Sequence, residues 1–245
     1  MNDDELAARL ATRAGDLLLD VRADFADATV EERKAAGDKQ SHDFLMAELA
    51  AQRPGDAVLS EEGVDDPVRL TAERVWIVDP LDGTREFSEL GRDDWAVHVA
   101  LWQSGELVAG AVALPAQNTT LSTPEVAAPR AFDGPPRIVV SRTRPPAIAL
   151  AVRDALDGTL VEMGSAGAKV AAVIRGVADV YVHAGGQYEW DSAAPVAVAR
   201  AAGLHTSRID GSPLVYNSAD PKLPDLVVCR PELAERVVAV TAGAA

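Results

Sequence analysis

The segment from Val75 to Thr84 constrains the fold more than any other part of the chain. It reads Val-Trp-Ile-Val-Asp-Pro-Leu-Asp-Gly-Thr. Four consecutive apolar residues followed by turn residues predict a buried strand. The strand delivers Asp79, Pro80 turns the chain, and Asp82 follows three residues after Asp79. Two carboxylates held at one strand end repel each other unless a cation lies between them. A plain surface turn is the alternative, because Asp, Pro and Gly all favour turns.

The groups around this turn suit a hard cation and a phosphate. Carboxylates and a main-chain carbonyl, such as that of Leu81, are the oxygen ligands that Mg²⁺ accepts. The NH groups of Gly83 and Thr84, at a predicted helix start, suit a phosphate oxygen.

Two further acidic features lie elsewhere in the chain. Glu61 and Glu62 follow a short apolar run, where a solvated loop is the ordinary interpretation. Asp191 stands at an expected helix N-cap, with Pro195 in the first turn, and capping alone explains its presence. The three acidic features together favour a metal cluster.

Helical and strand-like patterns organise the rest of the chain. Five prolines between residues 115 and 136 predict a boundary between two halves. Beyond it, strands and helices alternate, which implies an α/β layered arrangement. The predicted helices cover residues 6–25, 44–49, the stretch after Pro146, 165–175, 191–202 and the C-terminus. A polar stretch ending at Gly37-Asp38 is predicted to precede the second of these helices. The predicted strands cover 57–59, 75–78, 95–102 in a hairpin with 107–114, 138–140, 159–162, 180–182 and 226–229.

Composition limits the partners. The chain of 245 residues carries 38 acidic and 23 basic residues, a net charge of −15, which argues against binding nucleic-acid polymers or anionic membranes. No apolar run approaches the ~18 residues of a membrane span, and the acidic N-terminus does not resemble a signal peptide. The single cysteine, Cys229, fits a reducing compartment. We therefore expect a cytoplasmic globular protein. Zinc is disfavoured because the four histidines show no paired ligand spacing.

Taken together, these motifs resemble those of the lithium-sensitive, magnesium-dependent phosphomonoesterase superfamily. It includes inositol monophosphatases, fructose-1,6-bisphosphatases and 3′(2′),5′-bisphosphate nucleotidases. The motifs occur in the family's order, and the resemblance extends from the first helix to about Pro221. It implies an α/β fold, a layered αβαβα sandwich. Residues 1–130 would form an N-terminal half carrying most metal ligands and the catalytic threonine. Residues 131–245 would supply Asp191 and the specificity residues.

The resemblance also implies roles for the acidic residues. Two to three Mg²⁺ ions are expected, with inhibition by lithium. Glu61, Asp79 and the carbonyl of Leu81 would hold one ion. Asp79, Asp82 and Asp191 would hold a second, and Glu61 would help to bind a weaker third. Thr84, backed by an aspartate, would position the attacking water, without a covalent phosphoenzyme.

The aspartate behind Thr84 is either Asp38 or Asp43. The family places it at the start of the helix that leads to the Glu-Glu strand. Asp38 lies 23 residues before Glu61 and keeps the buried helix positions in register, whereas Asp43 would fall inside the helix. We therefore predict Asp38, with helix capping as its alternative role.

Within the superfamily, the chain most resembles the bisphosphate-nucleotidase branch called CysQ. That implies hydrolysis of the 3′-phosphate of 3′-phosphoadenosine 5′-phosphate to AMP, with its sulfate-bearing relative as a second substrate and a link to sulfate assimilation. Solvent-facing charge is the ordinary alternative for the two cations Arg142 and Lys169. Arg144 and His183 depart from the branch pattern. The motifs are Thr84-Arg85-Glu86-Phe87, Ser141-Arg142, Gly164-Ser165 with Lys169, Glu189-Trp190 and Tyr216-Asn217. The implied substrate contacts are Gly83, Thr84, Ser141, Arg142, Ser165, Lys169 and Asp191.

Three alternatives stay open. The first is an inositol monophosphatase or sugar bisphosphatase of the same superfamily. The second is an aspartyl-phosphate phosphatase, although its Asp-x-Asp-Gly-Thr motif separates the acids by one residue, not two. The third is a non-catalytic acidic metal-binding protein. The resemblance also suggests a homodimer.

Overall fold

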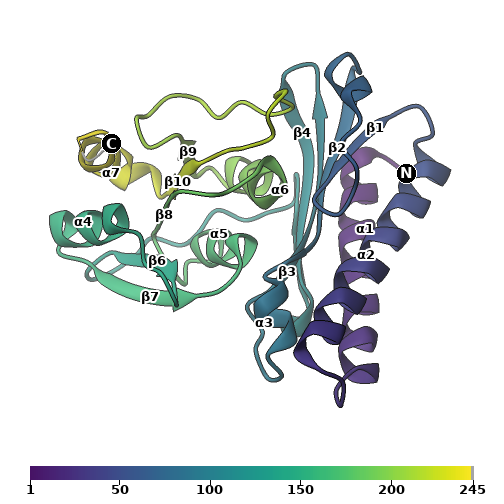
Figure 1. Ribbon diagram of the computed structural model, residues 1–245. Helices are drawn as coiled ribbons and strands as arrows, with labels where there is room; N and C mark the ends of the chain where they lie inside the picture. The colour runs from purple at the N-terminus through teal and green to yellow at the C-terminus, as the bar shows by residue number, and fades with distance from the viewer. Residues whose placement is uncertain (244–245) are drawn as a thin grey trace.

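Two five-stranded sheets alternate with three layers of helices (Figure 1). This computed structural model describes residues 1–243. The expected αβαβα sandwich is confirmed, because each helix pair buries its apolar face on a sheet. The outer face of the first sheet carries α1 (Asp3–Asp24) and α2 (Val30–Gln52), the middle layer is α5 (Ala166–Ile174) and α6 (Glu189–Ala201), and the outer face of the second sheet carries α4 (Ala147–Leu156) and α7 (Ala234–Ala242).

The first sheet has the strand order β1-β2-β3-β4-β5. Only β1 and β2 are parallel, and the predicted hairpin forms between β3 and β4. One strand, β5, lies in the proline-rich stretch where only a boundary was predicted; its Thr-Thr-Leu-Ser sequence has β-branched residues that suit a strand. The strands are β1 (Ala57–Ser60), β2 (Arg74–Asp82), β3 (Ala96–Gln103), β4 (Glu106–Leu114) and β5 (Thr119–Ser122).

The second sheet has the order β7-β6-β8-β10-β9. Because β7, β6 and β8 are parallel, the loops that follow them leave from one edge of the sheet. The antiparallel β10 ends at the opposite edge. We call these the carboxyl edge and the amino edge. The strands are β6 (Arg137–Ser141), β7 (Thr159–Met163), β8 (Val180–Ala184), β9 (His205–Ser207) and β10 (Asp225–Cys229).

Helix α2 begins earlier than the sequence indicated. Thr29 caps it in a capping box with Glu32, and the buried Arg33 donates to the carbonyls of Phe25 and Ser88. Gly37 does not end the helix. It allows close approach, because a Cβ there would lie 2.7 Å from the Phe87 ring. The polar stretch that was predicted to precede the helix is therefore its first two turns.

Helix α6 also begins before the predicted position. Its N-cap is Tyr188, and Asp191 is the third helical residue, so the expectation that Asp191 is the N-cap was wrong. Its carboxylate accepts from the Tyr188 amide at 2.7 Å, which still satisfies an N-terminal donor. Pro195 lies inside the helix rather than in its first turn. None of the helices formed by residues 1–243 is long and apolar enough to cross a membrane.

Candidate metal and phosphate site

Three carboxylates from two elements converge between the sheets. Asp79 and Asp82 lie at the end of β2, where the pairing with β3 shifts register, and Asp191 comes from the first turn of α6. Each contributes an oxygen atom, and these oxygens lie within 4.8 Å of one another. The turn holds Asp79 in place, because its Oδ1 accepts from the Leu81 amide at 3.0 Å. The two acids of the Asp-Pro-Leu-Asp turn are thus joined by Asp191, as the sequence predicted.

Burial and mutual repulsion disfavour the charged forms of most of these acids. Burial, followed by repulsion from Glu61 and Asp82, raises the pKa of Asp79 well above its ordinary value. Burial and the charge of Asp82 raise the pKa of Asp191 to about 7. Glu61 follows β1, and its carboxyl contacts Asp79; removal from water and the neighbouring acids raise its pKa to about 7. Negative charge on Asp79, Asp191 and Glu61 is therefore poorly compensated within the protein.

Asp82 differs from its neighbours because donors surround it. Burial alone would raise its pKa, but His98 and hydrogen bonds lower it to about 2. The Ser165 hydroxyl and the amides of Ala166 (3.1 Å) and Gly167 (2.6 Å) donate to its carboxylate. These donors form the N-terminus of α5, where a negative charge is favourable. Ser165, predicted from the sequence to contact substrate, therefore holds Asp82 in this structure.

His98 belongs to the site although sequence reasoning gave it no role. Its Nδ1 donates to the Trp190 carbonyl at 3.0 Å, and its Nε2 lies 3.2 Å from Asp82 Oδ2. The second contact is electrostatic rather than an aligned hydrogen bond. A Cβ at Gly167 would lie 2.0 Å from Nε2, so the glycine makes room for the imidazole. The signal was available: His98 is the one ionisable residue in the run from Trp95 to Trp102.

Thr84 opens the short helix α3 (Thr84–Ser88) directly after Gly83, which has a φ of 84°. The Thr84 hydroxyl lies 3.3 Å from Asp38 Oδ1 and 3.2 Å from the Leu81 carbonyl oxygen. Burial and the nearby Glu62 raise the pKa of Asp38 to about 6.

The structure also separates the two aspartates of α2. Asp43 forms an exposed ion pair with Lys39 at 2.6 Å, whereas Asp38 faces Thr84. Both lie inside the helix, so neither the capping role nor the expected helix start for Asp38 was right.

The two cations predicted near the substrate are both engaged within the protein. Arg142 donates to Glu86 at 2.8 Å and to Glu89 at 2.7 Å. Lys169 is only 7% exposed and donates to the carbonyls of Gly164 and Ser165. The solvent-facing alternative is therefore wrong for Lys169, which supports the loop that carries Ser165.

A pocket of about 480 Å³ lies at the carboxyl edge of the second sheet. Ser141 at the end of β6 and Ala184 at the end of β8 line it, together with Arg144 and His183. Unlike Arg142, Arg144 forms no ion pair with any residue in the described range 1–243. The loop after Ala184, whose Gly185 and Gly186 line the pocket, leads into α6 and Asp191.

Two other motif residues support the backbone instead of facing the site. Glu189 accepts from the amides of Asn217 (2.7 Å) and Ser218 (2.8 Å). The Tyr216 hydroxyl lies 3.2 Å from Ser192 Oγ on α6. These contacts fix the start of α6, and with it the position of Asp191.

The donor set fits a hard divalent cation. Three carboxylates meet at one point, and among residues 1–243 only the His98 imidazole supplies a positive charge in contact with them. Oxygen ligands without thiolates suit Mg²⁺ or a similar ion rather than a soft metal. The acidic cluster can therefore bind metal.

Comparison with known proteins places the chain in a family. Residues 2–242 match the inositol monophosphatase family, and the chain belongs to that family. A 3′-phosphoadenosine 5′-phosphate phosphatase of Mycobacterium tuberculosis is 54% identical over 240 residues, which cover 94% of this chain and 90% of that protein. The 3′(2′),5′-bisphosphate nucleotidase CysQ of Escherichia coli K12 is 34% identical, covering 85% and 91%. The crystal structure of CysQ from Bacteroides thetaiotaomicron matches with a TM-score of 0.76 at 27% identity, covering 92% and 96%.

Proposed function

We propose that this protein is a Mg²⁺-dependent phosphatase that hydrolyses the 3′-phosphate of 3′-phosphoadenosine 5′-phosphate, giving AMP and inorganic phosphate. The observation that carries the proposal is the largely buried cluster of Asp79, Asp82 and Asp191 beside the Thr84–Asp38 pair. The named activity of the mycobacterial relative supports the choice of substrate. The sulfate-bearing relative of that nucleotide is the second substrate we propose, which would connect the enzyme with sulfate assimilation.

The acidic residues would hold the metal. We assign Asp79, Asp82 and Asp191, with Glu61 and the carbonyl of Leu81, as ligands for two to three Mg²⁺ ions. When bound, Mg²⁺ neutralises the phosphate, activates water and stabilises the leaving oxygen. Without it the carboxylates would repel a phosphorylated substrate.

Thr84 and Asp38 handle the proton of the attacking water. The Thr84 hydroxyl donates toward Asp38, so the lone pairs of the Thr84 oxygen remain free to orient a water molecule. The water oxygen gives a proton toward the Thr84–Asp38 pair and attacks phosphorus as the bond to the 3′ oxygen breaks, and the 3′ oxygen leaves as a hydroxyl after taking a proton from solvent. A pKa of about 6 suits Asp38 as a proton acceptor near neutral pH. The amides of Gly83 and Thr84 would contact a phosphate oxygen.

The carboxyl-edge pocket would take the nucleoside 5′-phosphate side of the substrate. Arg144 and Ser141 line it and can bind a second phosphate. Arg142 would reach that phosphate only by exchanging one of its bonds to Glu86 and Glu89. An inositol monophosphate has no second phosphate to use this pocket. That difference favours a bisphosphate as the preferred substrate.

A phosphate-release assay tests the proposal. With Mg²⁺ present, we expect turnover of 3′-phosphoadenosine 5′-phosphate to exceed that of inositol 1-phosphate and fructose 1,6-bisphosphate, and lithium to inhibit it. A clear preference for inositol 1-phosphate would refute the nucleotidase assignment and favour the inositol monophosphatase alternative. Metal binding without any turnover would favour the non-catalytic alternative.

Arg144→Ala separates recognition from chemistry. We expect a raised KM for the bisphosphate nucleotide and unchanged turnover of inositol 1-phosphate. Arg236→Ala, at an exposed arginine of α7, is the matched control. The homodimer and the cytoplasmic location that the family suggests are part of the proposal, and sedimentation of the purified protein checks the first.

A further inference from the structure

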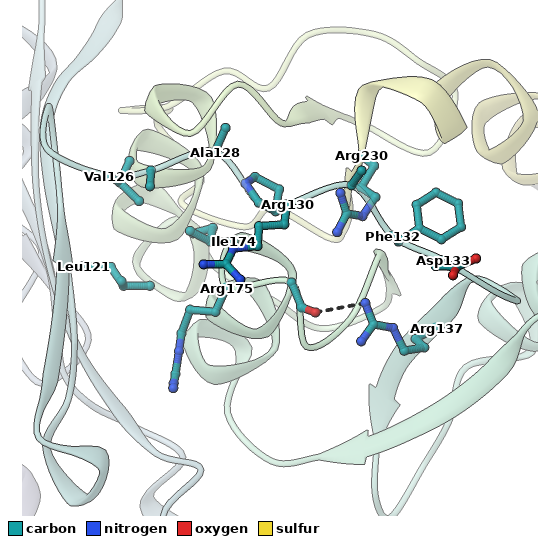
Figure 2. Close-up of a pocket in the computed structure, with 14 residues that line it drawn as sticks. Leu121, Val126, Ala128, Arg130, Phe132, Asp133, Arg137, Ile174, Arg175 and Arg230 are labelled. Carbon is teal, nitrogen blue, oxygen red and sulfur yellow. Dashed lines mark hydrogen bonds between the residues drawn. The ribbon is translucent and has the colours of Figure 1, made fainter.

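A second cavity, of about 710 Å³, lies at the amino edge of the second sheet (Figure 2). Its walls come from the start of β6, the end of α5, the residue after β10 and the segment 126–133. The N-terminus of α5 carries the donors to Asp82, whereas Ile174, Arg175 and Gly176 at its other end line the cavity. A helix of nine residues is about 14 Å long, so the two sites are separate.

Four arginines line this cavity in a chain with net charge −15. Arg137 and Arg230 both pair with the buried Asp179, at 2.8 and 2.6 Å, so that one carboxylate serves two guanidinium groups. Arg130 and Arg175 are exposed and form no ion pair with any residue between 1 and 243. Arg175 makes a hydrogen bond to the Gln117 side chain, which leaves most of its donors free.

The acidic groups nearby do not cancel this charge. Asp133 lines the cavity, and Glu232 lies 3.8 Å from the Arg230 guanidinium. With Asp179, three carboxylates face four guanidinium groups. The positive charge that no carboxylate neutralises is therefore that of Arg130 and Arg175, most of whose N–H donors remain free. Planar guanidinium groups of this kind recognise tetrahedral oxyanions well.

The lining also has apolar residues. Figure 2 shows Leu121, Val126 and Ile174 on the side of the first sheet, with Arg130 and Arg175 beside Ile174, and Arg137 and Arg230 across the cavity. The Phe132 ring covers the Arg230 guanidinium at 5.3 Å and holds it from one side. A cavity lined by guanidinium groups and by apolar side chains next to them favours a molecule that has both an oxyanion and an apolar body.

We infer that this cavity is a second ligand site, which binds a small organic anion bearing a phosphate or sulfate group. The oxyanion pairs with Arg130 and Arg175, and the apolar body packs against Leu121, Val126 and Ile174. The volume lies in the range of small-molecule sites, roughly 300–1,000 Å³.

Calorimetry on protein stripped of metal by a chelating resin tests the inference, because the acidic cluster then repels anions. The probes are phenyl phosphate, inorganic phosphate and phenol. We expect phenyl phosphate to bind more tightly than inorganic phosphate, and phenol to bind least. In the double variant Arg130→Ala/Arg175→Ala, affinity for phenyl phosphate should fall about tenfold or more, because charge-assisted hydrogen bonds are lost.

The control is Arg200→Ala/Arg236→Ala, which removes the same charge from exposed positions of α6 and α7. Unchanged affinity in this control supports the inference, whereas an equal fall in both double variants would overturn it. Absence of binding to the wild type at ~10 mM phenyl phosphate, or equal binding of phenol, would also overturn it. If the double variant fails to fold, Arg130→Ala alone serves, and it should weaken binding several-fold.

Discussion

The acidic cluster and the amino edge of the second sheet both contain fully buried aspartates, yet the two environments differ. Asp179 at the amino edge accepts from the backbone and side chain of Arg137 and from Arg230, and these partners lower its pKa below the ordinary value. Asp79 has carboxylates as its charged neighbours, and its pKa is raised. Removing one partner from a buried ion pair strongly destabilises a fold, so Asp179 has a structural role. Asp79 lies mainly among other carboxylates, which suits a site that binds a cation.

Asp79→Asn, in the acidic cluster, should have the largest effect, a loss of phosphatase activity. Asparagine keeps the acceptor for the Leu81 amide but removes one ligand charge, so we expect phosphatase activity to fall about a thousandfold or more. The same change relieves repulsion in the metal-free protein, and its thermal midpoint should rise by a few degrees. Activity close to wild type would refute the metal assignment.

Asp179→Asn, at the amino edge, should lower the stability of the fold and leave kcat near that of the wild type. It leaves the buried Arg230 without its carboxylate, which costs roughly 3–5 kcal/mol of unfolding free energy. Urea unfolding measures the loss, and kcat per folded molecule should stay near wild type. Asp154→Asn, at an exposed pair with Arg153, is the control. Equal stability of the two variants would contradict the structural role of Asp179.

Thr84→Val tests the proton path without touching a carboxylate. Removing the hydroxyl should lower kcat about 10²–10⁴-fold, the usual size of a general acid–base contribution. Thr84→Ser should restore most of it. The affinity for Mg²⁺, measured by calorimetry, should be unchanged in both variants, and a large loss of affinity would place Thr84 in the metal shell instead.

The stability of the metal-free protein should depend on pH in the direction set by the raised pKa values. Glu61 and Asp191 titrate at about 7 and Asp38 at about 6 in the fold, above their ordinary values. The folded state therefore binds more protons than the unfolded state over this pH range. The stability that these three carboxyls contribute is greatest below about pH 4 and is lost as pH rises toward 7. Mg²⁺ needs deprotonated ligands, and its stabilising effect should grow over the same interval.

Thermal unfolding at pH 5 and pH 8, with and without Mg²⁺, measures both effects. The shift caused by Mg²⁺ should be larger at pH 8. A shift that is equal at the two pH values would contradict the assignment of these carboxyls as ligands.

The smallest effect is expected at Asp43. Its exposed pair with Lys39 contributes little, so Asp43→Asn should leave kcat and the thermal midpoint unchanged. Asp38→Asn should lower kcat strongly. Equal effects of the two substitutions would contradict the assignment of Asp38.

Much of the fold could be predicted because its signals are local. The apolar run of β2, its Asp-Pro-Leu-Asp turn and the strand–helix alternation are readable in the chain and indicate an α/β layered arrangement. The number of layers was implied by the family resemblance. The start of α2 could not be read, because it depends on tertiary contacts: Arg33 reaches the Ser88 carbonyl and Gly37 packs on Phe87.

The site could be predicted only in part for the same reason. Metal-ligand types and turn spacing pointed to Asp79 and Asp82, but the contact of His98 with Asp82 requires the packing of β3 against Gly167. The partners of Arg142, Glu86 and Glu89, also come from a distant segment. Sequence patterns identify groups that can react, whereas the fold decides which of them are already paired.

A titration of Mg²⁺ into the metal-free protein tests the central claim most directly. Calorimetry should show saturable binding to the wild type, a large loss of affinity in Asp79→Asn, and wild-type affinity in Asp43→Asn. Equal Mg²⁺ affinity in the wild type and Asp79→Asn would show that the buried acids are not the metal site.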